Sequence, residues 1–99
     1  MKYTLRDEGD EAVLQIDGSL DALTAPDLKP VVERLVSERR RSVILELSSL
    51  RLIDSSGVGV IVSLLRRIRD HGGQLRIVGL RDQPRAIFRL LSLDRVFPL

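Results

Sequence analysis

The chain has 99 residues, 43% hydrophobic and 30% charged, so we expect one domain spanning residues 1–99, with a single core and no compositional sign of disorder. A net charge of +2 and 3% aromatic residues argue against direct nucleic-acid binding, which needs a strongly basic surface or a set of stacking rings. The lack of cysteine excludes disulfides and thiolate metal sites.

The hydropathy pattern argues against a membrane protein. No stretch approaches the ~18 uninterrupted apolar residues of a membrane span. The first residues lack the apolar segment of a secretory signal. We therefore expect a cytoplasmic protein without membrane association.

The first part of the chain is predicted to form a hairpin followed by a helix. Residues 3–7 and 12–17 alternate between apolar and polar and read as two strands joined by a short turn. A helical stripe then predicts a helix over residues 25–38. Thr24 and Asp27 approximate a capping box at its start, and Pro30 predicts either a kink or an irregular opening turn.

Strands and helices alternate in the rest of the chain. The segments are a strand at 43–47, a long helix ending near residue 71, a strand at 75–78, a helix at 83–91 and a candidate last strand at 96–99. Asp82 is expected to cap the last helix, and Gly72 follows the long one as a stop signal. Helices between strands imply parallel pairs, so the order β-β-α-β-α-β-α predicts an α/β fold with a mixed sheet of four to five strands.

The stretch from Ile53 to Ile61 organises the chain. An apolar run stops at Asp54, Ser55 and Ser56, and apolar residues then recur at Ile61, Leu64, Leu65 and Ile68 with helical spacing. Either Ser55 or Ser56 is expected at the N-cap, where unpaired N–H groups and the helix dipole suit a phosphate. Gly57 and Gly59 are expected to leave the first turn open to a partner.

Several kinds of catalytic site are excluded by residue identity. A serine hydrolase needs a base beside Ser55 or Ser56, but the sole histidine, His71, lies sixteen residues along the helix, or roughly 24 Å. Val62 stands where a dinucleotide fingerprint needs its third glycine, and no phosphate-binding loop is present. We expect no enzyme activity, no cofactor and no metal. His71 and the arginines at 39–41 are interpreted as cations at helix C-termini.

Residues 54–60 (Asp-Ser-Ser-Gly-Val-Gly-Val) resemble the phosphorylation motif of bacterial anti-sigma factor antagonists, members of the STAS-domain family. Residues 18–28 are similar to that family's segment between the second strand and the first helix, and residues 72–75 to the segment after its central helix. The similarity covers nearly the whole chain in order.

The resemblance implies a sheet with helices packed on one side and a partner-switching role. Family members bind an anti-sigma factor that is also a serine kinase, which releases a sigma factor, and phosphorylation ends the binding until a serine phosphatase reverses it. By position, Ser55 is the implied phosphoacceptor and Asp21 would lie beside it and engage the kinase. The rest of the implied partner-binding surface comprises Asp54, Ser56, Gly57, Val58 and Gly59.

Other interpretations stay open. Ser55 and Ser56 would act only as helix caps, and Asp21 only as a turn aspartate, in a STAS module without a phospho-switch that regulates a transporter or a sensory complex. A small enzyme is disfavoured by the missing catalytic groups. Nucleic-acid binding through Arg66, Arg67, Arg69 and Arg76 would give a steeply salt-dependent affinity.

Overall fold

The computed structural model describes residues 1–97 and has one mixed, five-stranded sheet. Its strands are β1 (Lys2–Glu8), β2 (Glu11–Leu20), β3 (Ser42–Glu46), β4 (Leu50–Ile53) and β5 (Gln74–Val78). Its α-helices are α1 (Lys29–Ser37), α2 (Ser55–Asp70) and α3 (Asp82–Leu90), with short 3-10 helices η1 (Ala25–Leu28) and η2 (Leu93–Arg95). The predicted α/β class, mixed sheet and alternation of elements are confirmed.

β2 pairs with three of the other four strands. It pairs antiparallel with β1 across the predicted hairpin and parallel with both β3 and β4, while β5 pairs parallel with β3. The first five residues of β2 pair with β3 and its last three pair with β4. The register of the β2–β4 pair shifts between Gly18 and Ser19. The sequence did not predict β4 as a separate strand, because four residues are too few to show a period.

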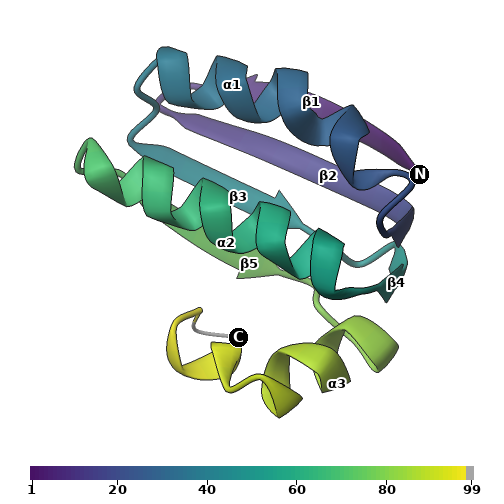
Figure 1. The fold of residues 1–99 in the computed structure, drawn as a ribbon. Helices are drawn as coiled ribbons and strands as arrows, with labels where there is room; N and C mark the ends of the chain where they lie inside the picture. Colours follow the sequence, from purple (N-terminus) through teal and green to yellow (C-terminus); the bar gives the residue numbers. More distant parts are fainter. Residues whose placement is uncertain (98–99) are drawn as a thin grey trace.

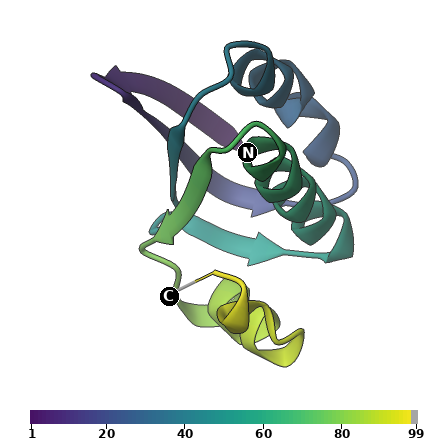
Figure 2. The same cartoon turned by 90° about the vertical axis from the view of Figure 1, so that its left-hand side faces the viewer.

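Helices α1 and α2 lie side by side over one face of the sheet, and α3 packs beside β4 (Figures 1 and 2). The stripe that predicted α2 is buried, with Ile61, Leu64, Leu65 and Ile68 each at most 4% exposed. Leu28, Val31, Val32 and Leu35 are buried from η1 and α1. These side chains meet the inward-facing residues of the strands in a single core. Within residues 1–97 no helix is both long and apolar enough to cross a bilayer.

The opening of the first helix is irregular rather than kinked. Residues 25–28 form η1, and Pro30 then lies in the first turn of α1, where its missing N–H removes no helical hydrogen bond. The predicted capping box is wrong. The Thr24 hydroxyl makes no capping bond and instead donates to the Ser19 carbonyl at 2.8 Å.

The C-terminal segment differs from the prediction in two ways. Asp82 is not a side-chain cap: it is the first residue of α3, preceded by Arg81 at the N-cap position. Val96 and Phe97 follow η2 and are not a strand, and the rest of the candidate strand lies outside the described residues. Phe97 instead packs on Phe88, with ring centroids 5.9 Å apart and both side chains fully buried.

A hydrogen bond links the C-terminus of α2 to the segment that follows α1. His71 is the C-cap of α2, and its Nε2 lies 2.6 Å from the carbonyl oxygen of Arg40. Because a carbonyl only accepts, Nε2 carries the proton. Arg40 in turn forms ion pairs with Glu38 and Asp7. These contacts join the ends of α1 and α2 at the edge remote from Ser55.

Candidate functional site

Ser55 is the first residue of α2 and its side chain is exposed, as is that of Ser56. Neither serine is the N-cap, so that prediction is wrong. The N-cap is Asp54, whose Oδ1 accepts a hydrogen bond from the Gly57 N–H at 3.0 Å. A carboxylate at this place satisfies a backbone donor and opposes the positive end of the helix. Because Asp54 caps the helix, the Ser55 hydroxyl at the tip of α2 is not needed for capping.

Asp54 also joins the start of α2 to the loop after β2. Its second oxygen, Oδ2, accepts a hydrogen bond from the Ala22 N–H at 3.2 Å. The Asp54 N–H donates to the Leu20 carbonyl at 3.2 Å. Asp54 thus fixes the position of residues 20–22 relative to the beginning of α2.

Asp21 lies in this same loop, and its carboxylate is used within the turn. It accepts hydrogen bonds from the N–H groups of Leu23 at 3.0 Å and Thr24 at 3.1 Å. The Thr24 Oγ1 also accepts from the Asp21 N–H at 2.9 Å. The structure therefore brings the loop of Asp21 to the Ser55 end of α2 through the neighbouring Ala22. Recognition of a kinase by Asp21 stays a prediction.

The small residues of the first turn have different roles. A Cβ on Gly57 would lie 2.5 Å from the Leu20 carbonyl oxygen and 2.7 Å from Ile53 Cγ1, so glycine is needed for α2 to approach β2 and β4. The expectation that Gly57 keeps the surface open to a partner is therefore wrong. Val58 is 8% exposed and belongs to the core. At Gly59, in contrast, a Cβ would meet nothing within 4 Å, and that position is open.

The Gln83 side chain, on α3, bonds the residue that precedes Asp54, and the sequence analysis did not predict this contact. Its Oε1 accepts from the Ile53 N–H at 2.9 Å, and its Nε2 donates to the Ile53 carbonyl at 3.0 Å. The side-chain amide pairs with the free edge of β4 as another strand would, one residue before Asp54. No local pattern signals this contact, because the two residues are 30 positions apart.

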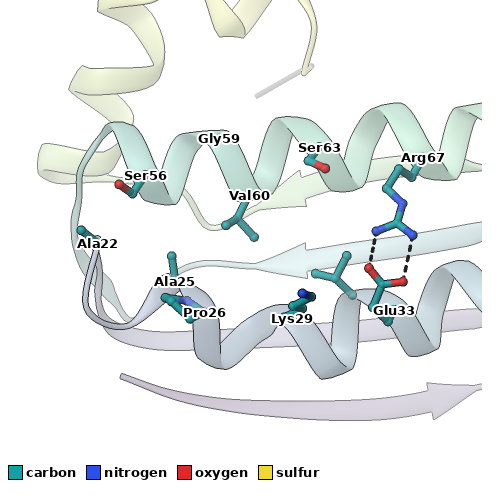
Figure 3. A pocket seen from close by; sticks show the side chains of 11 residues that line it. Ala22, Ala25, Pro26, Lys29, Glu33, Ser56, Gly59, Val60, Ser63 and Arg67 are labelled. Carbon is teal, nitrogen blue, oxygen red and sulfur yellow. Dashed lines mark hydrogen bonds and ion pairs between the residues drawn. The ribbon is translucent and has the colours of Figure 1, made fainter.

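A groove lies between α1 and α2 and has Ser56 at one end (Figure 3). We call it the α1–α2 groove: a cavity of about 590 Å³ lined from η1 and α1 by Ala25, Pro26, Lys29, Val32 and Glu33, from α2 by Ser56, Gly59, Val60, Ser63 and Arg67, and by Ala22. Figure 3 shows Ala25, Val60, Glu33 and Arg67 between the two helices, with Ser56 and Ala22 at one end.

An ion pair lies at the end of the groove away from Ser56 (Figure 3). Arg67 donates to Glu33 through both terminal nitrogens, at 2.6 and 2.9 Å. The hydrogen bonds from Arg67 hold the pKa of Glu33 below its ordinary value, and the same pairing raises the pKa of Arg67. Both groups are solvated, so the pair orients the groove wall more than it stabilises the fold.

Ser55 lies beside the Asp54 carboxylate at the start of α2 and far from the single histidine of the chain. Within residues 1–97, no group of three or more histidine, aspartate or glutamate side chains is placed to hold a metal. His71 lies at the opposite end of the sixteen-residue α2 from Ser55, so it cannot act as a base there. What remains is an exposed hydroxyl at a helix N-terminus, next to a carboxylate.

Known proteins share this fold and sequence pattern. The curated anti-sigma-B factor antagonist of Staphylococcus aureus (strain NCTC 8325 / PS 47) is 26% identical over 80 residues, 81% of this chain and 74% of that protein. A proposed anti-sigma factor antagonist from Thermotoga maritima is 26% identical with a TM-score of 0.89, over 96% of this chain and 82% of that one.

A second similar structure is that of the Bacillus cell fate determinant SpoIIAA in its phosphorylated form, with a TM-score of 0.77 over 95% of this chain and 86% of that one. At 19% identity it shows the fold alone. The family model that matches this chain is the STAS domain, over residues 3–99. The motif at the start of α2, the mixed sheet with its helical layer and this match agree, and the chain belongs to the STAS domain family.

Proposed function

We propose that this chain is an anti-sigma factor antagonist that acts by partner switching in the cytoplasm. Unphosphorylated, it binds an anti-sigma factor with serine kinase activity and thereby releases a sigma factor. Phosphorylation of Ser55 ends the binding, and a serine phosphatase restores it. The observation that carries the proposal is the exposed Ser55 hydroxyl at the first position of α2, beside an N-cap that is already satisfied by Asp54.

The local geometry supports a switch that alters binding rather than fold. Phosphate adds roughly −1.5 to −2 charges, which the positive end of α2 partly compensates. The same charge lies next to Asp54 in sequence and near the loop that carries Asp21. A partner that covers these groups must desolvate like charges together, which weakens the complex. The phosphorylated form of SpoIIAA has the same fold, which supports a phosphate being tolerated.

The partner-binding residues fall into two kinds under this proposal. Ser56 and Gly59 are exposed and would touch the partner directly. Gly57 and Val58 are buried and would hold the start of α2 in place. Asp54 does both, because it is exposed and also bonds Ala22 and Gly57.

The test is to incubate the purified chain with its candidate anti-sigma kinase and ATP, then locate phosphate by mass spectrometry and measure affinity by calorimetry. We expect phosphate on Ser55, persistent binding of Ser55→Ala and weak binding of Ser55→Asp. Ser56→Ala is the matched control and should still be phosphorylated. Phosphate on Ser56 alone, or equal affinities of Ser55→Ala and Ser55→Asp, would contradict the proposal.

A second candidate is a STAS regulatory module without a phospho-switch. A sulfate transporter family protein from Wolinella succinogenes has the same fold, with a TM-score of 0.75 over 88% of this chain and 70% of that one, at 18% identity. Stable binding to a partner kinase with no phosphate on Ser55 would favour this module.

A further inference from the structure

The α1–α2 groove has an apolar floor and a rim of small side chains. Ala25 and Val32 are each 7% exposed, and Val60 is half-buried between the two helices. On the α2 side the rim is formed by Gly59 and Ser63, one turn apart and both exposed. Because these side chains are small, another backbone can approach α2 closely along this line.

The charges of the groove are unbalanced in favour of one cation. Glu33 and Arg67 neutralise each other at the far end. Lys29 remains, exposed on the α1 side, and no ion pair of Lys29 occurs among residues 1–97. A segment that fills the groove therefore gains from an acidic side chain opposite Lys29.

The groove is continuous with the surface around Ser55. Its near end is formed by Ser56 and by Ala22, whose N–H is bonded to Asp54. Leu23, in the same loop, is 87% exposed and offers an apolar contact at that end. A partner that covers Ser55 thus also reaches the near end of the groove.

We propose that the α1–α2 groove receives an amphipathic helix of the anti-sigma factor, with apolar side chains on the groove floor and a carboxylate opposite Lys29. The inference rests on the proposed function and adds the second contact region of the same interface. A helix suits the groove because α1 and α2 run side by side, so a third helix packs its side-chain ridge between them. Phosphate at Ser55 then acts at one end of a longer contact.

The test uses one position on each wall of the groove, Lys29 on α1 and Ser63 on α2. Ser63 lies eight residues along α2, or about 12 Å, and its replacement by leucine fills the groove without touching the phosphoacceptor. Lys29→Glu reverses the unpaired charge. Ser63→Ala removes the hydroxyl without filling the groove, and Lys2→Glu makes the same charge reversal on β1. Folding of each variant is checked by circular dichroism.

Affinity for the purified anti-sigma factor that phosphorylates Ser55 is measured by calorimetry. We expect Ser63→Leu and Lys29→Glu to weaken binding at least about tenfold and the two controls to change it less than about threefold. A single acid-to-lysine change in the partner helix should restore binding of Lys29→Glu. Failure of every such change to restore binding would overturn the assignment of a carboxylate.

The outcomes separate this inference from the proposed function. If Ser63→Leu and Lys29→Glu bind like the wild type while Ser55→Asp does not, the groove is not used and the switch stands. If the groove variants lose binding while Ser55→Asp binds normally, the helix contact stands and the phospho-switch fails. Self-association of the free chain that Ser63→Leu abolishes would assign the groove to a second copy and overturn the inference.

Discussion

The Asp54 carboxylate accepts one hydrogen bond from Gly57 within its own helix and another from Ala22, 32 residues earlier in the chain. The residue before the proposed phosphoacceptor is therefore both a helix cap and a tie between segments. Any change at Asp54 acts on the stability of α2 and on the position of the loop of Asp21 together.

Asp54→Ala should lower the free energy of unfolding by about 1–2 kcal/mol, because it removes a cap and leaves the Ala22 N–H without its acceptor. Asp54→Asn should lower the free energy of unfolding by a smaller amount, because the amide oxygen of asparagine can still cap the helix. Asp70→Ala, at the other end of α2, is the control and should be neutral or slightly stabilising. Urea unfolding measures all three, and an equal loss for Asp70→Ala would contradict the role of Asp54.

Gly57→Ala and Gly59→Ala should change stability in opposite directions although they lie two residues apart. At Gly57 the new methyl group meets a backbone oxygen that cannot move aside, so we expect a loss of roughly 1–3 kcal/mol. At Gly59 the methyl group enters open space, and the gain in helix propensity is about 1 kcal/mol. Denaturant midpoints compare the two variants. A loss of stability in both would contradict the finding that a close approach occurs at Gly57 and not at Gly59.

Gln83→Met should destabilise the chain by about 1–3 kcal/mol, because methionine keeps much of the length of the side chain but cannot pair with Ile53. Gln74→Met is the control: Gln74 is exposed at the start of β5, and its change should be nearly neutral. Hydrogen exchange at the Ile53 amide provides a local readout. Unchanged protection of that amide in Gln83→Met would refute the proposed support of β4.

Glu33 should make a small stabilising contribution that depends on pH. Its pKa is lowered in the folded chain by Arg67, so the contribution is full above the ordinary value of 4.5 and is lost as the pH falls through the lower folded value. The difference in Tm between wild type and Glu33→Gln should therefore shrink in acid and in high salt. In an Arg67→Gln background the pH-dependent difference should shrink to the smaller contribution from Lys29, and an unchanged difference there would contradict the role of Arg67.

Ser55→Asp should leave the fold intact, with stability changed by less than about 1 kcal/mol, because a negative charge at the first helical position is favourable. Val58→Asp, three residues further, should lose several kcal/mol because it places a carboxylate in the core. Thermal unfolding followed by circular dichroism distinguishes the two. A large loss in Ser55→Asp would show that charge at this site disturbs the fold itself.

Regular, repeated patterns made much of the fold predictable. The spacing of Ile61, Leu64, Leu65 and Ile68 located α2 and its buried face, and Gly72 located its end. The start of α2 was located to within two residues, but the cap was assigned to serine. Serine and aspartate are both good N-caps, so sequence preference alone does not choose between them.

The contacts that shape the site come from distant parts of the chain and leave no local pattern. Gly57 reads as an open position in sequence, and only the nearby Leu20 carbonyl shows that it is enclosed. Gln83 reads as an ordinary residue of an amphipathic helix, yet it completes the edge of β4. The groove likewise depends on how closely α1 and α2 pack, which propensity does not specify.

The pairing of β2 with three neighbours has a consequence for how the chain can fail. A slip of one place along this strand would turn Leu14 and Ile16 toward the opposite face. It would also carry Leu20 out of reach of Asp54 and Gly57, which it contacts at the start of α2. Correct register of the sheet and correct geometry at the start of α2 are thus achieved together, and a misaligned chain would lose the hydrogen bond from Asp54 to Leu20.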